Sequence, residues 1–223
     1  MRKSGLVLFC ALVVISILLL YTAYDKQEKT IDFKDLADVL LVKDLGHTLE
    51  EFNKVSALSG LGLLSTAMAI GPLVLFFPGI FKRYLWWRKL LGLTGVAFII
   101  LHSIYGIAVK YQLSARNMFF ENEKLLGVIA ALFSLAIFVA MASTSNSASI
   151  KALGFKRLKI LHRFGYAALA LGVLHFIIME TKIDGRISVR PYGWVFLYLP
   201  FITLFLKFVS LIYESLKNRY RPR

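Results

Sequence analysis

The sequence has a single cysteine and no dinucleotide-binding motif, and each of these absences excludes a class of function. Cys10 is the only cysteine among the 223 residues, which excludes an intrachain disulfide and a thiol-based metal cluster. The sequence also lacks a glycine-rich strand–turn–helix motif and any soluble stretch long enough to form a dinucleotide-binding fold. If the protein handles electrons, it must therefore receive them from another molecule.

Apolar sequence is what the chain has in abundance. Hydrophobic residues make up 58% of it and the mean hydropathy is +0.68, well above an ordinary soluble domain. Six stretches approach or exceed the roughly 20 residues that cross a bilayer as a helix, and they lack the alternation of membrane β-strands. We therefore predict an all-α, multi-pass protein of the cell (inner or plasma) membrane, folded as a six-transmembrane-helix bundle. The predicted spans are Gly5–Tyr24, Ala57–Phe77, Leu91–Val109, Leu125–Ser143, Ile160–Thr181 and Trp194–Tyr213.

The first predicted span has the basic start of a secretory signal. Its apolar run, Gly5–Tyr21, is longer than the usual hydrophobic region of a signal, and no A-x-A-like cleavage site follows it. We interpret the segment as a retained anchor helix.

The net charge of +14 orients the protein in the membrane. Lys and Arg number 27 against 13 Asp and Glu, a balance that could also indicate nucleic-acid binding. The basic clusters, however, fall in alternate connections, and almost all acidic residues fall in the others. This positive-inside pattern predicts that both termini are cytoplasmic. The predicted cytoplasmic clusters are Arg2/Lys3, Lys82/Arg83/Arg88/Lys89, residues 151–163 and the tail with Lys217, Arg219, Arg221 and Arg223.

The chain divides into four predicted regions. Residues 1–24 form the anchor helix, 25–55 an acidic extracytoplasmic segment, 56–214 the transmembrane core that holds any cofactor, and 215–223 a basic cytoplasmic tail. Apolar residues between 31 and 41 recur at roughly helical spacing, which predicts a surface helix in the acidic segment. That segment either docks an extracytoplasmic partner or covers the bundle as a lid.

Three of the four histidines lie in or at the edge of apolar segments: His102, His162 and His175. Ionisable residues are costly in a membrane, so a single one could simply bond a neighbouring helix, whereas three together indicate ligands. His102 and His175 lie at similar distances from the cytoplasmic ends of two parallel spans, within about 6 Å in depth. They can therefore face each other across the bundle, as the two axial ligands of a haem do.

His162 lies one level lower on the same helix as His175. Thirteen residues separate the two, about 20 Å along the axis, so a second haem would fit there. A regular helix would turn the two side chains about 220° apart. To face one side, either the helix contains a bulge or His162 precedes its regular part.

Small and basic residues accompany the histidines. Gly95 lies seven residues before His102, and Gly172 lies three before His175. Such residues let a flat porphyrin approach a helix, and they equally serve ordinary helix packing in membranes. Arg163 belongs to a basic cluster that either pairs with haem propionates or acts only in positive-inside orientation.

Two segments carry a family resemblance. They read RKLLGLTGVAFIILHSIYG (Arg88–Gly106) and STSNSASIKALGFKRLKILHRFGYAALALGVLHF (Ser143–Phe176). They resemble the ferric reductase-like transmembrane domain and, within it, look most like MsrQ, the haem-binding membrane subunits of periplasmic methionine sulfoxide reductase systems. The resemblance covers roughly residues 59–213.

This resemblance implies an iron-containing, b-type cytochrome with one or two haems. It makes His102 and His175 the outer pair of haem ligands and His162 the inner ligand. Arg88 stands near the place where two-haem relatives have a further histidine, and we count it with Gly95, Gly172 and Arg163 as cofactor-binding. Electrons would pass from a cytoplasmic flavin (FMN) reductase or quinol to an extracytoplasmic acceptor, for which a molybdopterin methionine sulfoxide reductase is the first candidate.

Two other functions stay open. The first is a stand-alone ferric reductase that reduces metal chelates at the outer face. The second is a haem-free transporter or assembly factor that uses the histidines for protons or metals, which would require acids deep in the membrane. The acids nearest the spans lie instead at helix ends: Glu121, Glu123, Glu180 and Glu214.

Overall fold

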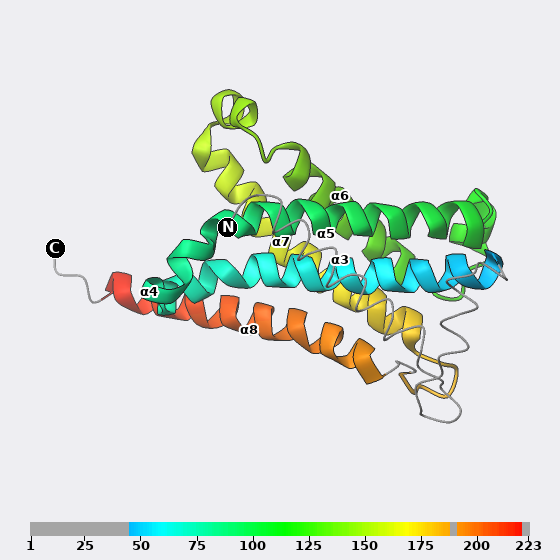
Figure 1. The fold of residues 1–223 in the computed structure, drawn as a ribbon. Helices are drawn as coiled ribbons and strands as arrows, with labels where there is room; N and C mark the ends of the chain where they lie inside the picture. Colours follow the sequence, from blue (N-terminus) through cyan, green and yellow to red (C-terminus); the bar gives the residue numbers. More distant parts are fainter. Residues whose placement is uncertain (1–44, 188–190, 220–223) are drawn as a thin grey trace.

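The computed structural model describes residues 45–187 and 191–219, and this part of the chain is helical (Figure 1). A single antiparallel bridge between Thr181 and Ile187 is its only described β-type pairing. The α-helices are α3 (Leu45–Phe76), α4 (Pro78–Phe81), α5 (Leu85–Tyr105), α6 (Leu125–Ser143), α7 (Ser147–Glu180) and α8 (Pro191–Arg219). A 3₁₀ turn (Lys82–Tyr84) precedes α5, and two π turns (Gly106–Lys110 and Arg116–Phe120) follow it.

Five described helices are long and apolar enough to cross a membrane. They correspond to the last five predicted spans, so the prediction of an all-helical, multi-pass membrane protein is confirmed. The predicted first span, Gly5–Tyr24, and the predicted surface helix of residues 31–41 lie outside the described residues. The count of six and the cytoplasmic side of both termini therefore stay predictions.

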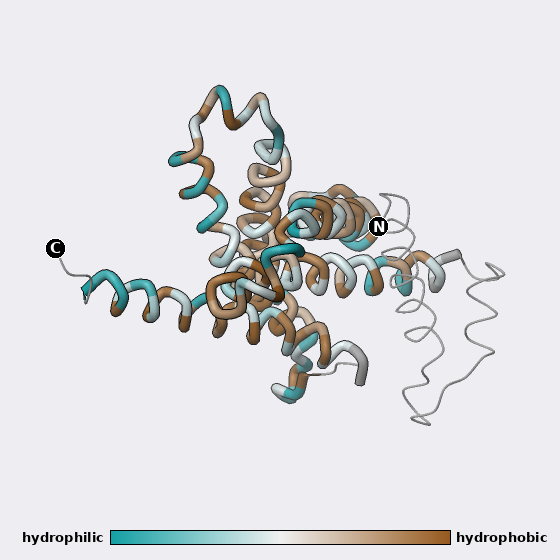
Figure 2. Tube along the Cα trace, turned by 60° about the vertical axis from the view of Figure 1, so that its left-hand side comes forward, coloured by the Kyte–Doolittle hydropathy of each residue, from teal (hydrophilic) through white to brown (hydrophobic). Residues whose placement is uncertain are grey.

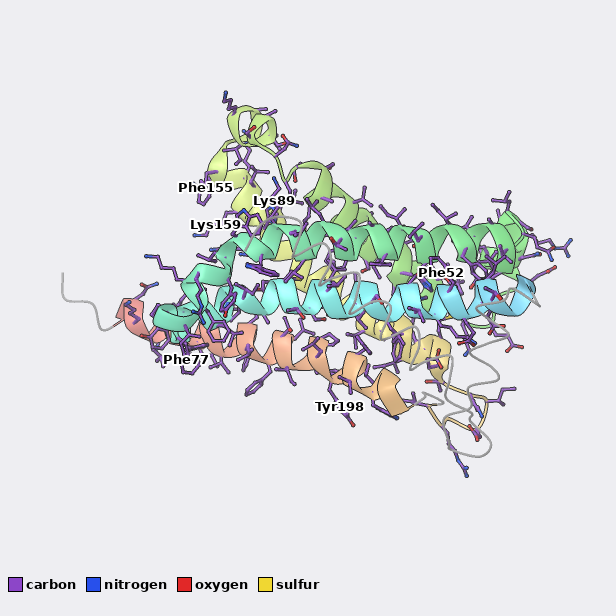
Figure 3. The ribbon with its side chains drawn as sticks, in the orientation of Figure 1. Phe52, Phe77, Lys89, Phe155, Lys159 and Tyr198 are labelled. Carbon is purple, nitrogen blue, oxygen red and sulfur yellow. The ribbon has the colours of Figure 1, made fainter. Side chains whose placement is uncertain are left out.

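The outer surface of the bundle is apolar, as a lipid-facing surface must be. Hydrophobic residues are frequent along the long helices (Figure 2), and many large hydrophobic side chains are exposed. Phe77 and Tyr198 are more than half exposed and point away from the bundle (Figure 3). Lipid tails can solvate such side chains, so their exposure carries no hydrophobic penalty in a bilayer.

Helix α3 is the centre of the bundle. It lies between α5 and α8 and packs chiefly against these two helices (Figure 1). The apolar stretch of α3 that could cross a membrane is 67% buried, whereas none of the other four described spans exceeds 28%. The hydroxyl of Thr203 in α8 donates to the carbonyl oxygen of Ser65 in α3, 3.1 Å away, and ties the two helices together.

Four of the five long described helices begin earlier than the apolar pattern predicts, and α3 is one of them. Helix α3 begins at Leu45 rather than Ala57, so residues 45–55 of the predicted acidic segment form its first turns. The charges there compensate one another, because Lys54 Nζ lies 2.6 Å from Glu50 and 2.9 Å from Glu51. Apolar composition marks where a helix enters lipid, and paired charges let the helix extend beyond that point.

Helix α7 contains a kink close to its start. Gly154 has φ 75° and ψ 153°, a conformation that is essentially restricted to glycine. No other residue of α7 departs from helical backbone angles, so residues 155–180 form one regular helix. His162 lies inside it. Both explanations that would turn His162 and His175 to one side, a bulge between them or a late helix start, are therefore wrong.

Glycines set the close crossing of α3 and α5. A Cβ atom on Gly60 would lie 2.7 Å from Ile99 Cδ1 and 3.1 Å from the Gly95 carbonyl oxygen. A Cβ atom on Gly95 would lie 2.9 Å from Leu64 Cγ and 3.2 Å from the Gly60 carbonyl oxygen. The two backbones approach each other where neither residue has a side chain, the usual solution for packing in membranes.

Helices α6 and α7 pack through a similar set of small residues. The hydroxyl of Ser134 donates to the carbonyl oxygen of Ala168 at 2.8 Å, in a buried position. Near the other end, Gly127 lies against Ile178 and Met179, where an added Cβ atom would come within 3.0 to 3.1 Å. These contacts hold the start of α6 against the end of α7, close to His175.

Candidate functional site

The structure brings His102 and His175 together. α5 carries His102 near its end, and α7 carries His175 five residues before its own end. The centroids of the two imidazole rings are 6.1 Å apart, and the ring planes are inclined by 65°. Residues separated by 73 positions in the chain thus form one pair of facing imidazoles.

Each imidazole is oriented by a hydrogen bond at Nδ1. His175 Nδ1 lies 3.0 Å from the carbonyl oxygen of Gly127 on α6. His102 Nδ1 lies 2.8 Å from Asn53 Oδ1 on α3. Both oxygens can only accept, so each Nδ1 donates its proton and each Nε2 carries a lone pair. This is the tautomer, and the supporting oxygen, that histidine ligands of metals have.

A cavity of about 520 Å³ adjoins this pair, which we call the His102–His175 cavity. Its volume falls within the range of small-molecule sites. Apolar side chains such as Leu61, Ile99 and Phe176 form much of its wall, and Gly172 also lines it. Charged residues occur on the same lining: Glu50, Lys54, Lys110 and Glu180.

The donor set fits a metal that brings its own equatorial ligands. No group of three or more His, Cys, Asp and Glu residues within the described ranges could hold a bare metal ion. An imidazole nitrogen lies about 2 Å from a metal it ligates, so two rings on opposite sides of one ion have centroids roughly 6 Å apart. The observed 6.1 Å matches that value. Two axial imidazoles and a flat macrocycle such as a porphyrin satisfy these conditions together.

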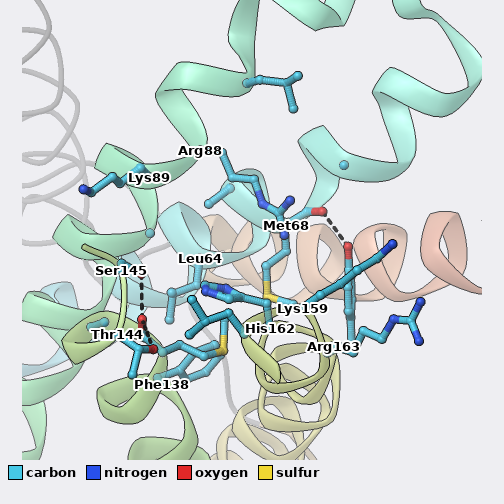
Figure 4. A pocket seen from close by; sticks show the side chains of 18 of the residues that line it. Leu64, Met68, Arg88, Lys89, Phe138, Thr144, Ser145, Lys159, His162 and Arg163 are labelled. Carbon is cyan, nitrogen blue, oxygen red and sulfur yellow. Dashed lines mark hydrogen bonds between the residues drawn. The ribbon is translucent and has the colours of Figure 1, made fainter. Parts of the chain in front are cut away.

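His162 lines a different cavity, of about 820 Å³, which we call the His162 cavity. Arg88 from α5 and His162 from α7 both point into it, whereas Lys89 points away from them (Figure 4). This lining contains five basic residues and one acid, Glu214, and none of its basic residues forms an ion pair with a described acid. Its basic residues are Arg88, Lys89, Lys159, Arg163 and Lys207.

Leu64 and Phe138 line both cavities. Each is almost fully buried, with 4% and 3% of its surface exposed, and both belong to the main hydrophobic core. They form an apolar partition between the two cavities. A regular α7 explains the separation, because it turns His162 and His175 toward different sides.

The predicted site residues divide between the two cavities. His102, His175 and Gly172 line the first, and His162, Arg88 and Arg163 line the second. Gly95 lines neither, since it lies at the crossing of α3 and α5. Their roles in cofactor binding stay predictions.

The sequence pattern did not single out Asn53 or Gly127. Asn53 falls in the predicted acidic segment, and Gly127 acts through its backbone carbonyl, which no side-chain pattern reveals. One signal was present for Asn53. It lies seven residues before Gly60, just as His102 lies seven after Gly95. That relation becomes informative only when the two glycines are known to meet.

Comparison with models of known families identifies the family of this chain. The model of the family described as "Ferric reductase like transmembrane component" matches residues 56–173, just over half of the chain. The match includes His102 and His162 and ends two residues before His175. The chain belongs to the ferric reductase-like transmembrane family. The family resemblance predicted from the two histidine-bearing segments is thereby confirmed.

Proteins of two kinds are among the curated proteins similar to this chain. The magnetosome protein MamZ of Paramagnetospirillum magneticum is 29% identical over 100 residues, which are 45% of this chain and 16% of MamZ. The other group is named protein-methionine-sulfoxide reductase heme-binding subunit MsrQ. The subunit of Rhizobium meliloti is 28% identical over 140 residues, 63% of this chain and 62% of that protein. The subunit of Deinococcus radiodurans is 34% identical over 90 residues, 40% and 44% respectively. The chain thus spans less than two thirds of the length of each of these relatives.

Proposed function

We propose that this protein binds haem b between His102 and His175 and serves as the membrane electron-transfer subunit of an oxidoreductase system. One observation carries the proposal. Two imidazoles face each other at 6.1 Å, and each has its Nδ1 hydrogen-bonded to an oxygen, so that both Nε2 atoms are available as ligands. The haem-binding subunits among the relatives support the choice of cofactor.

The residues of the site have separable roles. His102 and His175 would hold the haem iron, and Asn53 and the Gly127 carbonyl orient the two rings. Apolar residues of the cavity wall exclude water and hold the ring system. A haem bound there supplies an iron that takes up and releases one electron at a time.

The proposed haem is not attached to the chain in the way that a c-type haem usually is. Thioether attachment of a c-type haem uses the two cysteines of a C-x-x-C-H motif, and this chain has only Cys10. Ligation and packing alone must therefore retain the cofactor.

We further propose that electrons enter from a cytoplasmic flavin reductase or quinol and leave to an extracytoplasmic acceptor. The likeness to subunits named for protein-methionine-sulfoxide reductase supports a catalytic subunit of that kind as the acceptor. Mixing the reduced protein with such a subunit and a methionine sulfoxide substrate should reoxidise the haem. A ferric chelate offered without any partner tests the stand-alone reductase instead.

The first experiment is a reduced-minus-oxidised spectrum of the purified protein with a pyridine haemochrome count per chain. We expect a b-type spectrum that is lost in His175→Ala and His102→Ala and retained in His162→Ala. A full haem complement in His175→Ala would refute the assignment. A ratio of two haems in the wild type, falling to one in His162→Ala, would place a second haem in the His162 cavity.

A further inference from the structure

Asn53 is the only side chain that hydrogen-bonds one of the two facing imidazoles among the described residues. The partner of His175 is a backbone carbonyl, which no substitution removes directly. The partner of His102 is an amide side chain on another helix, at 2.8 Å. A substitution can therefore remove the hydrogen-bond acceptor of His102 directly, but not that of His175.

The geometry of the α3–α5 crossing brings Asn53 to His102. The two helices run antiparallel, because Gly60 meets Gly95 while Gly71 meets Arg88. Asn53 lies seven residues before Gly60, and His102 lies seven residues after Gly95. Seven residues are close to two helical turns, so each residue returns to the face of its helix that carries the glycine. The contact of Asn53 with His102 is thus a consequence of the glycine crossing.

The surroundings of Asn53 favour a fixed side chain. It lies in the part of α3 that precedes Pro72, and it lines the His102–His175 cavity. Lys54, the adjacent cation, is bonded to Glu50 and Glu51 on the same helix. The amide oxygen of Asn53 is left to accept from His102 Nδ1.

We propose that Asn53 is a positioning residue for His102: its amide oxygen holds the imidazole in the tautomer with a lone pair on Nε2 and sets how strongly that nitrogen donates to the metal. An acceptor at Nδ1 increases the basicity of a metal-bound imidazole, and hydrogen bonding of this kind tunes haem potentials. The proposal rests on the proposed haem binding. It assigns part of the segment 25–55 to the cofactor site.

Two variants that differ in acceptor strength test the proposal. Asn53→Asp offers a stronger acceptor, which stabilises the oxidised iron and lowers the midpoint potential. Asn53→Leu removes the acceptor, which raises the potential and weakens haem retention by about 10- to 100-fold. A change of packing alone would not shift the two potentials in opposite directions.

The measurements are a redox titration, the low-temperature EPR spectrum of the oxidised protein and the rate of haem loss to apomyoglobin. Asn117→Ala is the matched control, because the side-chain amide of Asn117 forms no hydrogen bond with a described residue and lines neither cavity. We expect the control to match the wild type in all three measurements.

Each outcome separates this inference from the proposed function. A wild-type protein without haem would refute both. A wild type with haem, combined with Asn53 variants whose potentials equal the wild type or shift in one direction, would refute the role of Asn53 alone. If Asn53→Leu retains no haem, Asn53→Asp decides: a lower potential supports the proposal, and an unchanged or higher potential or loss of haem refutes it.

Discussion

At the scale of single residues, Tyr166 replaces a backbone hydrogen bond that is missing from another helix. Pro72 lies inside α3 and has no N–H, so the carbonyl of Met68, four residues earlier, loses its helical donor. The hydroxyl of Tyr166 in α7 donates to that carbonyl oxygen at 3.0 Å. A carbonyl left unpaired inside a membrane bundle is costly, so this bond replaces the one that the helix lacks. A proline in one span is therefore stabilised by a tyrosine 94 positions further along the chain.

Replacing Tyr166 with Phe should destabilise the protein by about 1–3 kcal/mol, the cost of an unpaired buried carbonyl. The change keeps the ring, so packing and the contact with Lys207 are largely retained. Thermal unfolding in detergent measures the effect. Tyr198→Phe is the control, since Tyr198 is 57% exposed and points away from the bundle. Equal unfolding temperatures for the two variants would contradict the prediction.

At the scale of helices, the crossing of α3 and α5 joins stability to the site. Gly60 and Gly95 let the backbones approach, and two turns away the same pair of helices places Asn53 beside His102. Whatever separates the helices at the glycines should also lengthen the hydrogen bond to His102. Packing and ligand orientation are therefore coupled through one interface.

Gly95→Ala should lower stability by about 1–3 kcal/mol through overpacking, because the new methyl would meet Leu64 and the backbone of Gly60. It should also shift the haem potential in the same direction as Asn53→Leu. The control is Gly79→Ala, where an added Cβ atom meets nothing within 4 Å. Unfolding curves and redox titrations of both variants provide the comparison, and a Gly95→Ala protein that matches its control would contradict the coupling.

At the scale of the whole molecule, charge and cavities give the bundle two different ends. The His162 cavity is lined by basic residues of α5, α7 and α8, and the His102–His175 cavity lies toward the opposite ends of α5 and α7. The positive-inside rule predicts that the His162 cavity faces the cytoplasm. Leu113, 77% exposed in the connection after α5, should then lie outside.

Cysteine accessibility in intact cells tests this orientation. In a background with Cys10→Ser, we expect Leu113→Cys to react with a membrane-impermeant maleimide added outside. Lys151→Cys, at the exposed start of α7, should react only after the membrane is opened. Labelling in the reverse order would overturn the predicted topology and the outward direction of electron transfer.

Much of the architecture could be predicted from the sequence by itself. Five of the predicted spans recur as long apolar helices, because crossing hydrocarbon requires about 20 apolar residues whatever the neighbouring helices are. Histidine is rare in this chain and concentrated in its apolar segments, and this distribution alone indicates His102, His162 and His175 as candidate ligands. Both conclusions depend on the cost of polar groups in lipid, which is a local property of each segment.

The tertiary structure decided the contacts that each site residue makes. It set the ring centroids of His102 and His175, which the sequence predicted could face each other, 6.1 Å apart, and it placed His162 in another cavity and Asn53 2.8 Å from His102. It also gave Gly95 a place at a helix crossing instead of on a cavity wall. These outcomes depend on the rotation of each helix about its axis and on where two helices cross. Both are set by close contacts between side chains and backbones far apart in the chain, so no single segment contains them.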